Sequence, residues 1–207
     1  MRRSFRVLCW FAIVVVHLAL ASGRVDIYGQ QVVKDGPQQG FVPSISLTTA
    51  NGERVDLRQL TGDKVGVFHL LYTRCVACGN GMEHLKAVQN ELARDGLLGE
   101  KVVIFSITVD PERDTPEALK TYAKSIEVKP GWTFLTGTAA QIQKVRANFE
   151  PPPLDLSASE KEATRTLKHT GMLQIINGAT GKRTSISVTA EPEHILDRIA
   201  RVQSPEP

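Results

Sequence analysis

The sequence predicts an α/β fold of three layers, in which a mixed central sheet is flanked by helices and preceded by a β-hairpin. Two nearly continuous apolar runs, Val65–Tyr72 and Val102–Val109, have the composition of strands that are buried on both faces. Between them, Gly81–Ala93 carries apolar residues at helical spacing. A strand, a helix and a strand in this order predict two parallel strands joined by a right-handed crossover.

Hairpins are predicted before and after this unit, and they make the sheet mixed. In Pro43–Leu57, apolar and polar residues alternate on either side of Asn51-Gly52, which is a strong turn signal. Met172–Ile176 and Thr184–Val188 have strand composition and are joined by a short segment that contains glycine. Apolar residues at helical spacing between positions 195 and 202 predict a last helix.

Two further helices have recognisable start signals. Thr115 is expected to cap a helix that has Pro116 at its first position. Thr138 and Gln141 have the spacing of a capping box, which opens another helix. Trp132–Leu135, between these two helices, is expected to be a short strand.

The first 21 residues have the pattern of a secretory signal peptide. Basic residues precede Val7–Ala21, a stretch of 15 residues without a charge, and Ala19-Leu20-Ala21 is a small-x-small cleavage site. A membrane span needs about 20 apolar residues, so we expect cleavage, with an uncleaved membrane anchor as the alternative. A polar linker (22–42), the predicted α/β domain (43–203) and a short tail (204–207) are expected to follow. The protein is therefore expected to be exported.

The charge balance gives no reason to expect a nucleic-acid partner. The chain has a formal net charge of +3. Its excess of basic residues is confined to positions 1–21, and the rest of the chain has 22 basic and 22 acidic residues. Electrostatic attraction to nucleic acid needs a basic surface, which a balanced chain does not predict.

Cys75 and Cys78 are the two cysteines outside the predicted signal peptide, which contains Cys9. They follow the first buried run and precede the first helix, where the helix dipole stabilises thiolates. Such a pair can exchange disulfides or bind a soft metal ion. A purely structural disulfide is disfavoured, because cross-linking so short a loop gains little chain entropy. A CxxC pair at this position predicts a thioredoxin-like fold.

His169 helps to distinguish disulfide exchange from metal binding by the two cysteines. It precedes the predicted strand that begins at Met172, and in a thioredoxin-like sheet the turn before this strand lies against the cysteine turn. Dithiol oxidoreductases of this fold place a cis-proline there, but the chain has no proline between Pro153 and Pro192. A histidine at this place favours a third metal ligand, and a general base for Cys75 is the alternative.

Five segments, in one order along the chain, resemble a known family. They are Val42-Pro-x-Ile45-x-Leu47 with Asn51-Gly52, Leu71-Tyr72-Thr73-x-Cys75, Ile107-Thr-Val-Asp110-Pro-Glu-Arg-Asp114-Thr, Gly131-Trp132-x-Phe134-Leu-Thr-Gly137, and His169-Thr170. Together they resemble the Sco/SenC family of copper-binding proteins, which help to assemble the CuA centre of cytochrome c oxidase. The resemblance covers roughly residues 42–202. Family members usually have three residues between the two cysteines, whereas this chain has Val76 and Ala77.

The resemblance implies a copper site formed by Cys75, Cys78 and His169, which would hold Cu(I) or Cu(II). It implies a metallochaperone whose partner is the cytochrome c oxidase subunit that carries CuA, or another copper acceptor. The expected location is the periplasm, with the protein either soluble or anchored to the inner membrane.

The CxxC spacing keeps a second function open, that of a thiol–disulfide reductase. In that case Cys75 attacks a partner's disulfide and Cys78 resolves the mixed disulfide. The reaction would keep the cysteines of a copper-site partner reduced, and a thiol–disulfide reductant would then be a further partner.

Other residues near the motif have structural interpretations. Met82 fits the core stripe of its helix, and His69 lies within a buried strand as a core or sheet-edge residue. His84 lies off the apolar stripe and is not expected to be a ligand. Asp110 is expected to order its loop or to support the site indirectly, because a carboxylate is a poor ligand for Cu(I). Thr73 is expected to shape the cysteine turn.

Overall fold

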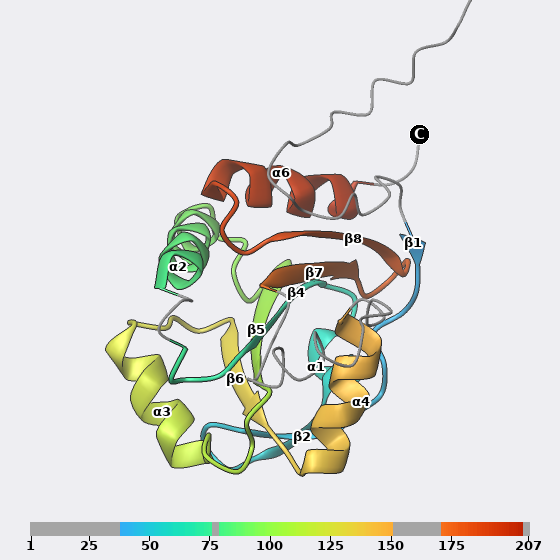
Figure 1. The fold of residues 1–207 in the computed structure, drawn as a ribbon. Coiled ribbons are helices and arrows are strands. Elements are labelled where there is room, and N and C mark those ends of the chain that lie inside the picture. The colour runs from blue at the N-terminus through green and yellow to red at the C-terminus, as the bar shows by residue number, and fades with distance from the viewer. Residues whose placement is uncertain (1–37, 76–78, 151–170, 205–207) are drawn as a thin grey trace, which may run out of the picture. The chain divides into compact units, whose positions relative to one another are not determined.

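The sheet of the described chain contains eight strands and has helices on both faces (Figure 1). The structure is a computed structural model that describes residues 38–75, 79–150 and 171–204. In sheet order, the strands are β1 (Gln38–Gln39), β8 (Lys182–Ser187), β7 (Met172–Asn177), β4 (Val65–Leu71), β5 (Val102–Thr108), β6 (Trp132–Thr136), β2 (Ser46–Thr49) and β3 (Arg54–Asp56). The helices are α1 (Leu57–Thr61), α2 (Gly79–Arg94), α3 (Pro116–Ser125), α4 (Ala139–Phe149) and α6 (Pro192–Gln203).

Two hydrophobic cores lie on the two faces of the sheet. One is formed by the strands with α2, α3 and α6, and the other by the strands with α1 and α4. Successive residues of β4 alternate between them: Val67 belongs to the first core and Phe68 to the second, where its ring stacks on those of Phe105 and Phe149. A strand covered on both faces must be apolar along its whole length, which explains the continuous apolar runs of β4 and β5.

β4 lies at the centre of the sheet and sets the position of the cysteine turn. It pairs in parallel with β5, with Leu71 opposite Thr108, and antiparallel with β7, with His69 opposite Leu173. Because β7 runs against β4, the N-terminal end of β7 lies at the same edge of the sheet as the C-terminal end of β4. Gly171, just before β7, therefore lies at the edge where the cysteine turn begins.

The predicted three-layer, thioredoxin-like fold with a mixed sheet is confirmed. The hairpin around Asn51-Gly52 forms β2 and β3, and β4, α2 and β5 form the predicted parallel unit. Thr115 caps α3 through its side chain, and Thr138 and Gln141 form both bonds of the capping box of α4.

Two local features differ from the sequence-based expectation. Leu57, expected to end a strand, begins the short helix α1, whose N-cap is Asp56. Gln38–Gln39, within the predicted linker, pairs with β8, and Val42 is 1% exposed in the core. A two-residue strand has no detectable periodicity, so the sequence pattern could not reveal it.

The predicted signal peptide or membrane anchor (1–21), most of the linker and the last three residues lie outside the described residues. Within the described part of the chain, no helix is long and apolar enough to cross a membrane.

Candidate functional site

The cysteine turn connects the central strand to the first long helix. After β4 ends at Leu71, the backbone N–H of Cys75 donates to the carbonyl oxygen of Tyr72 at 3.1 Å and closes a tight turn. α2 begins at Gly79. Cys75 is partly exposed and disulfide-bonded in this structure. The turn lies at the C-terminal edge of the parallel strands, where α/β proteins usually bind their ligands.

The carboxylate of Asp114 anchors this turn. Its Oδ2 accepts hydrogen bonds from the backbone N–H of Thr73 at 3.1 Å and from the Thr108 hydroxyl at 2.6 Å, while its Oδ1 accepts one from the Thr73 hydroxyl at 2.6 Å. Asp114 is 1% exposed and Thr108 is fully buried. A buried carboxylate needs such donors, so these bonds fix the backbone two residues before Cys75.

Asp110 orders the loop that carries Asp114, as the sequence analysis predicted. Its backbone N–H donates to the Thr108 hydroxyl at 2.9 Å, and its carbonyl oxygen accepts from the Asp114 N–H at 2.9 Å. Its carboxylate pairs with Arg113 at 3.1 Å. These bonds order the loop after β5. The Val109 N–H, which donates to the Leu71 carbonyl oxygen at 2.7 Å, joins the start of this loop to the end of β4.

Val188 connects the first turn of α2 to the segment that precedes β7. Its backbone N–H donates to the carbonyl oxygen of Gly171 at 2.7 Å. Its side chain fills the space beside Gly81, where an added Cβ would lie only 2.6 Å from Val188 Cγ1. The close approach requires glycine at position 81. Gly171 and Gly81, far apart in sequence, therefore both contact Val188.

The other residues considered near the motif have structural roles. Met82 is 5% exposed in the core of α2, and His69 is 1% exposed in the central strand, so it is a core residue. His84 Nδ1 lies 2.8 Å from the carbonyl oxygen of Ala190, a contact that ties α2 to the segment before α6. Thr73 shapes the turn as expected.

A groove of about 510 Å³ runs between the cysteine turn and α3. The residues that line it are Thr73, Arg74, Arg113, Glu117, Ala118, Thr121, Tyr122 and Ser125. Burial, reinforced by the negative charges of Asp114 and Glu83, raises the pKa of Tyr122 above its usual value. The Tyr122 phenol therefore stays neutral, and the groove presents both charged and polar groups beside the turn.

Two of the three predicted copper ligands, Cys78 and His169, lie outside the described residues. Among residues 38–75, 79–150 and 171–204, no cluster of three or more His, Cys, Asp or Glu side chains is placed to hold a metal ion. The ligand set therefore remains a prediction, and Cys75 is the one predicted ligand whose surroundings the structure describes.

The roles of Asp114 and Val188 were not predicted from the sequence. Asp114 was considered only as part of the segment that begins at Ile107, although Asp110-Pro-Glu-Arg-Asp114-Thr follows a buried strand that ends in Thr108. An acid close to the end of a buried strand, with Thr73 at the end of the neighbouring strand, is the signal that could have revealed the contact.

Comparisons with known proteins identify the family. The chain matches the SCO1/SenC family over residues 34–204. It is 32% identical to the SCO1 protein homolog of Bacillus subtilis (strain 168) over 124 residues. This alignment covers 57% of this chain and 62% of that protein.

Solved structures agree with this assignment. Bradyrhizobium japonicum ScoI with copper bound has 25% identity and a TM-score of 0.60, over 79% of this chain and 99% of that one. BsSco has 22% identity and a TM-score of 0.65, over 85% of this chain and 100% of that one. BsSco has a disulfide switch and is a member of the Sco family of cytochrome c oxidase assembly proteins. The chain therefore belongs to the SCO1/SenC family.

Proposed function

We propose that the protein is an exported metallochaperone that binds one copper ion through Cys75, Cys78 and His169. It passes the ion to the CuA-bearing subunit of cytochrome c oxidase or to another copper acceptor. Two thiolates and an imidazole are donors that suit Cu(I). The copper-bound structure of a relative supports copper as the metal, and the description of BsSco supports a role in oxidase assembly.

The contact between Gly171, Val188 and Gly81 is the observation that carries the proposed ligand set. His169 precedes Gly171 by two residues, a span of at most about 7 Å. Cys78 directly precedes α2, whose first turn contacts Val188 through Gly81. Gly171, two residues after His169, thus lies near the start of the helix that follows the cysteines, which supports a site with three ligands.

We further propose that the protein acts in the periplasm, either soluble or attached to the inner membrane by residues 1–21. An oxidising compartment would convert a free CxxC pair to a disulfide, so the protein must be reduced before it can bind copper. The disulfide on Cys75 represents the oxidised form, which has no thiolate at position 75 to offer the metal.

Titration of the reduced protein with Cu(I) tests the ligand set. Cys75→Ser and His169→Ala should each lower the affinity, and affinity should fall with acid because the ligands must be deprotonated. His194→Ala is the matched control, because His194 is an exposed histidine on α6. If both Cys75→Ser and His169→Ala bind copper as the wild type does, the assignment is wrong.

A thiol–disulfide reductase is the second candidate, favoured by the CxxC spacing and by the disulfide on Cys75. Cys75 would attack a partner's disulfide and Cys78 would resolve the mixed product. Cys78→Ser should then trap a mixed disulfide between Cys75 and the partner. If no mixed disulfide forms and the wild type does not reduce disulfides, this candidate is refuted, whereas the copper proposal is unaffected.

A further inference from the structure

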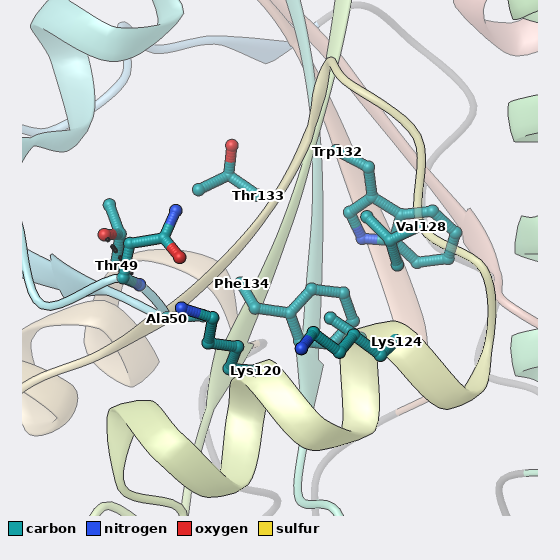
Figure 2. Close-up of a pocket in the computed structure, with 10 residues that line it drawn as sticks. Thr49, Ala50, Lys120, Lys124, Val128, Trp132, Thr133 and Phe134 are labelled. Atoms are coloured by element: carbon teal, nitrogen blue, oxygen red, sulfur yellow. Dashed lines mark hydrogen bonds between the residues drawn. The ribbon is translucent and has the colours of Figure 1, made fainter.

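A cavity of about 310 Å³ lies between α3, β2 and β6 (Figure 2). It shares no lining residue with the groove beside the cysteine turn. Trp132 and Phe134 of β6 contribute aromatic surface to its wall. Both are almost fully buried, at 4% and 2% exposed, and their rings stack with centroids 5.7 Å apart. The Trp132 indole N–H already donates to the Ser106 hydroxyl. Together with the half-buried Ala50, Ala123 and Val128, the rings give the cavity an apolar lining.

Two ammonium groups border the cavity. Figure 2 shows the Lys120 side chain reaching from α3 toward Thr49 and Ala50, and the Lys124 side chain reaching toward the Phe134 ring. Both lysines are exposed, and within the described part of the chain neither forms an ion pair or a side-chain hydrogen bond. Lys124 lies in the last turn of α3, where a positive charge is favourable, and Lys120 is attracted to Glu117 one turn earlier. Both ammonium groups nevertheless remain exposed at the edge of the cavity.

The remaining polar groups at the cavity strengthen its preference for an anion. The Asn51 amide and the Thr133 hydroxyl also line it, and they can donate hydrogen bonds. No acidic residue is among the lining residues. Glu117, an acidic residue of α3, lines the groove beside the cysteine turn and also attracts Lys120. The lining therefore combines an apolar surface with positive charge and hydrogen-bond donors.

The spacing of the lysines indicates the form of the anion. Lys120 and Lys124 are four residues apart, a rise of about 6 Å along α3. Alternate residues of an extended peptide point to the same side and are about 6.6–6.8 Å apart. Because the lysine side chains are long and flexible, their ammonium groups can adjust to two carboxylates at this spacing on an extended segment.

We propose that this cavity is a docking site for an extended acidic segment of a partner protein. Two carboxylates on alternate residues pair with Lys120 and Lys124, and an apolar side chain on the same side of the segment lies against Trp132 and Phe134. The cavity is at the small end of the range of about 300–1,000 Å³ for ligand sites, so it accommodates one large side chain. The site is about one helix diameter, ~10 Å, from the groove beside the cysteine turn.

Binding of a synthetic peptide tests the proposal directly. The probe is fluorescein-labelled Gly-Phe-Ser-Glu-Ser-Glu-Gly, in which Phe and both Glu lie on alternate residues. We expect saturable binding at concentrations below ~1 mM, weakened by salt because exposed charges are screened. Amide NMR shifts should concentrate at Thr49, Ala123 and Thr133. A peptide with Gln in place of both Glu, and one with the two Glu adjacent, should each bind at least threefold more weakly.

Charge reversals on the protein give the second arm of the test. Lys120→Glu and Lys124→Glu should each weaken binding at least threefold, since each replaces an attraction with a repulsion. Lys144→Glu is the matched control, because it makes the same change on α4, which packs on the other face of the sheet, and it should bind as the wild type does.

Three results would overturn the proposal. The first is no binding of the acidic peptide at ~1 mM, and the second is equal binding of the Gln peptide. The third is binding to phosphatidylglycerol vesicles, lost in Lys120→Glu, without binding to the peptide, since that result would assign the lysines to a membrane surface. The peptide comparison remains decisive even if a variant of the protein fails to fold.

Discussion

The buried carboxylate of Asp114 permits a sharp prediction, because its alanine and asparagine variants should behave differently. Asp114→Ala removes the acceptors of the Thr73 N–H, the Thr73 hydroxyl and the Thr108 hydroxyl. A buried donor left without a partner costs about 1–3 kcal/mol. With Thr73 partly exposed and Thr108 fully buried, we expect Asp114→Ala to lower the free energy of unfolding by about 3 kcal/mol or more.

Asp114→Asn should cost much less, about 1 kcal/mol. The asparagine carbonyl oxygen can replace Oδ2 and accept from both the Thr73 N–H and the Thr108 hydroxyl. Its amide NH₂ then lies where Oδ1 was, and the Thr73 hydroxyl can rotate to accept from it. Every group keeps a partner, and only the strengthening by charge is lost.

Urea unfolding of the reduced protein, followed by circular dichroism, measures both variants. Copper affinity should follow the same order, because Thr73 lies two residues before Cys75. If asparagine destabilises as much as alanine does, the negative charge and not the hydrogen-bond geometry holds the turn. If alanine costs less than ~1 kcal/mol, the three bonds do not stabilise it.

Three further predictions concern other parts of the fold. Gly81→Ala should lower the free energy of unfolding by about 1–3 kcal/mol, because the added Cβ would overlap Val188, and this cost exceeds the helix preference of alanine. Adding Val188→Ala should relieve the overlap, so the double mutant should lose less stability than the sum of the single mutants in urea unfolding. The raised pKa of Tyr122 contributes stability that is complete below the unfolded value of 10.0 and is lost as the pH rises from there through the folded pKa. Tyr122→Phe should therefore flatten the alkaline decline of stability, and an unchanged decline would exclude Tyr122 as its source. Asp56→Ala should remove the N-cap of α1 at a cost of about 1 kcal/mol at neutral pH, and thermal unfolding of equal midpoint would contradict that role.

Elements whose residues bury a face or cap an end could be predicted from the sequence. The continuous apolar runs of β4 and β5 predicted central strands because both faces of each are covered. Thr115 and Thr138 predicted helix starts because their side chains bond to the backbone three residues later. These signals are local, so they can be read from a few consecutive residues.

Contacts between distant segments could not be predicted in the same way. The bond from Thr73 to Asp114 spans 41 residues and depends on the parallel pairing of β4 and β5. The fit of Val188 against Gly81 depends on how β8 and α2 pack, and neither a valine nor a glycine in the sequence indicates such a contact. The cavity beside Lys120 and Lys124 likewise exists only once β2, β6 and α3 are assembled. The predicted ligands Cys78 and His169 lie outside the described residues.

X-ray absorption at the copper edge, on the wild type and on His169→Ala, tests the central claim most directly. The proposed site predicts two sulfur neighbours and one nitrogen neighbour around copper in the wild type, and loss of the nitrogen neighbour in His169→Ala. A wild-type site with sulfur neighbours alone, or a nitrogen neighbour that persists in His169→Ala, would contradict a copper site formed by Cys75, Cys78 and His169.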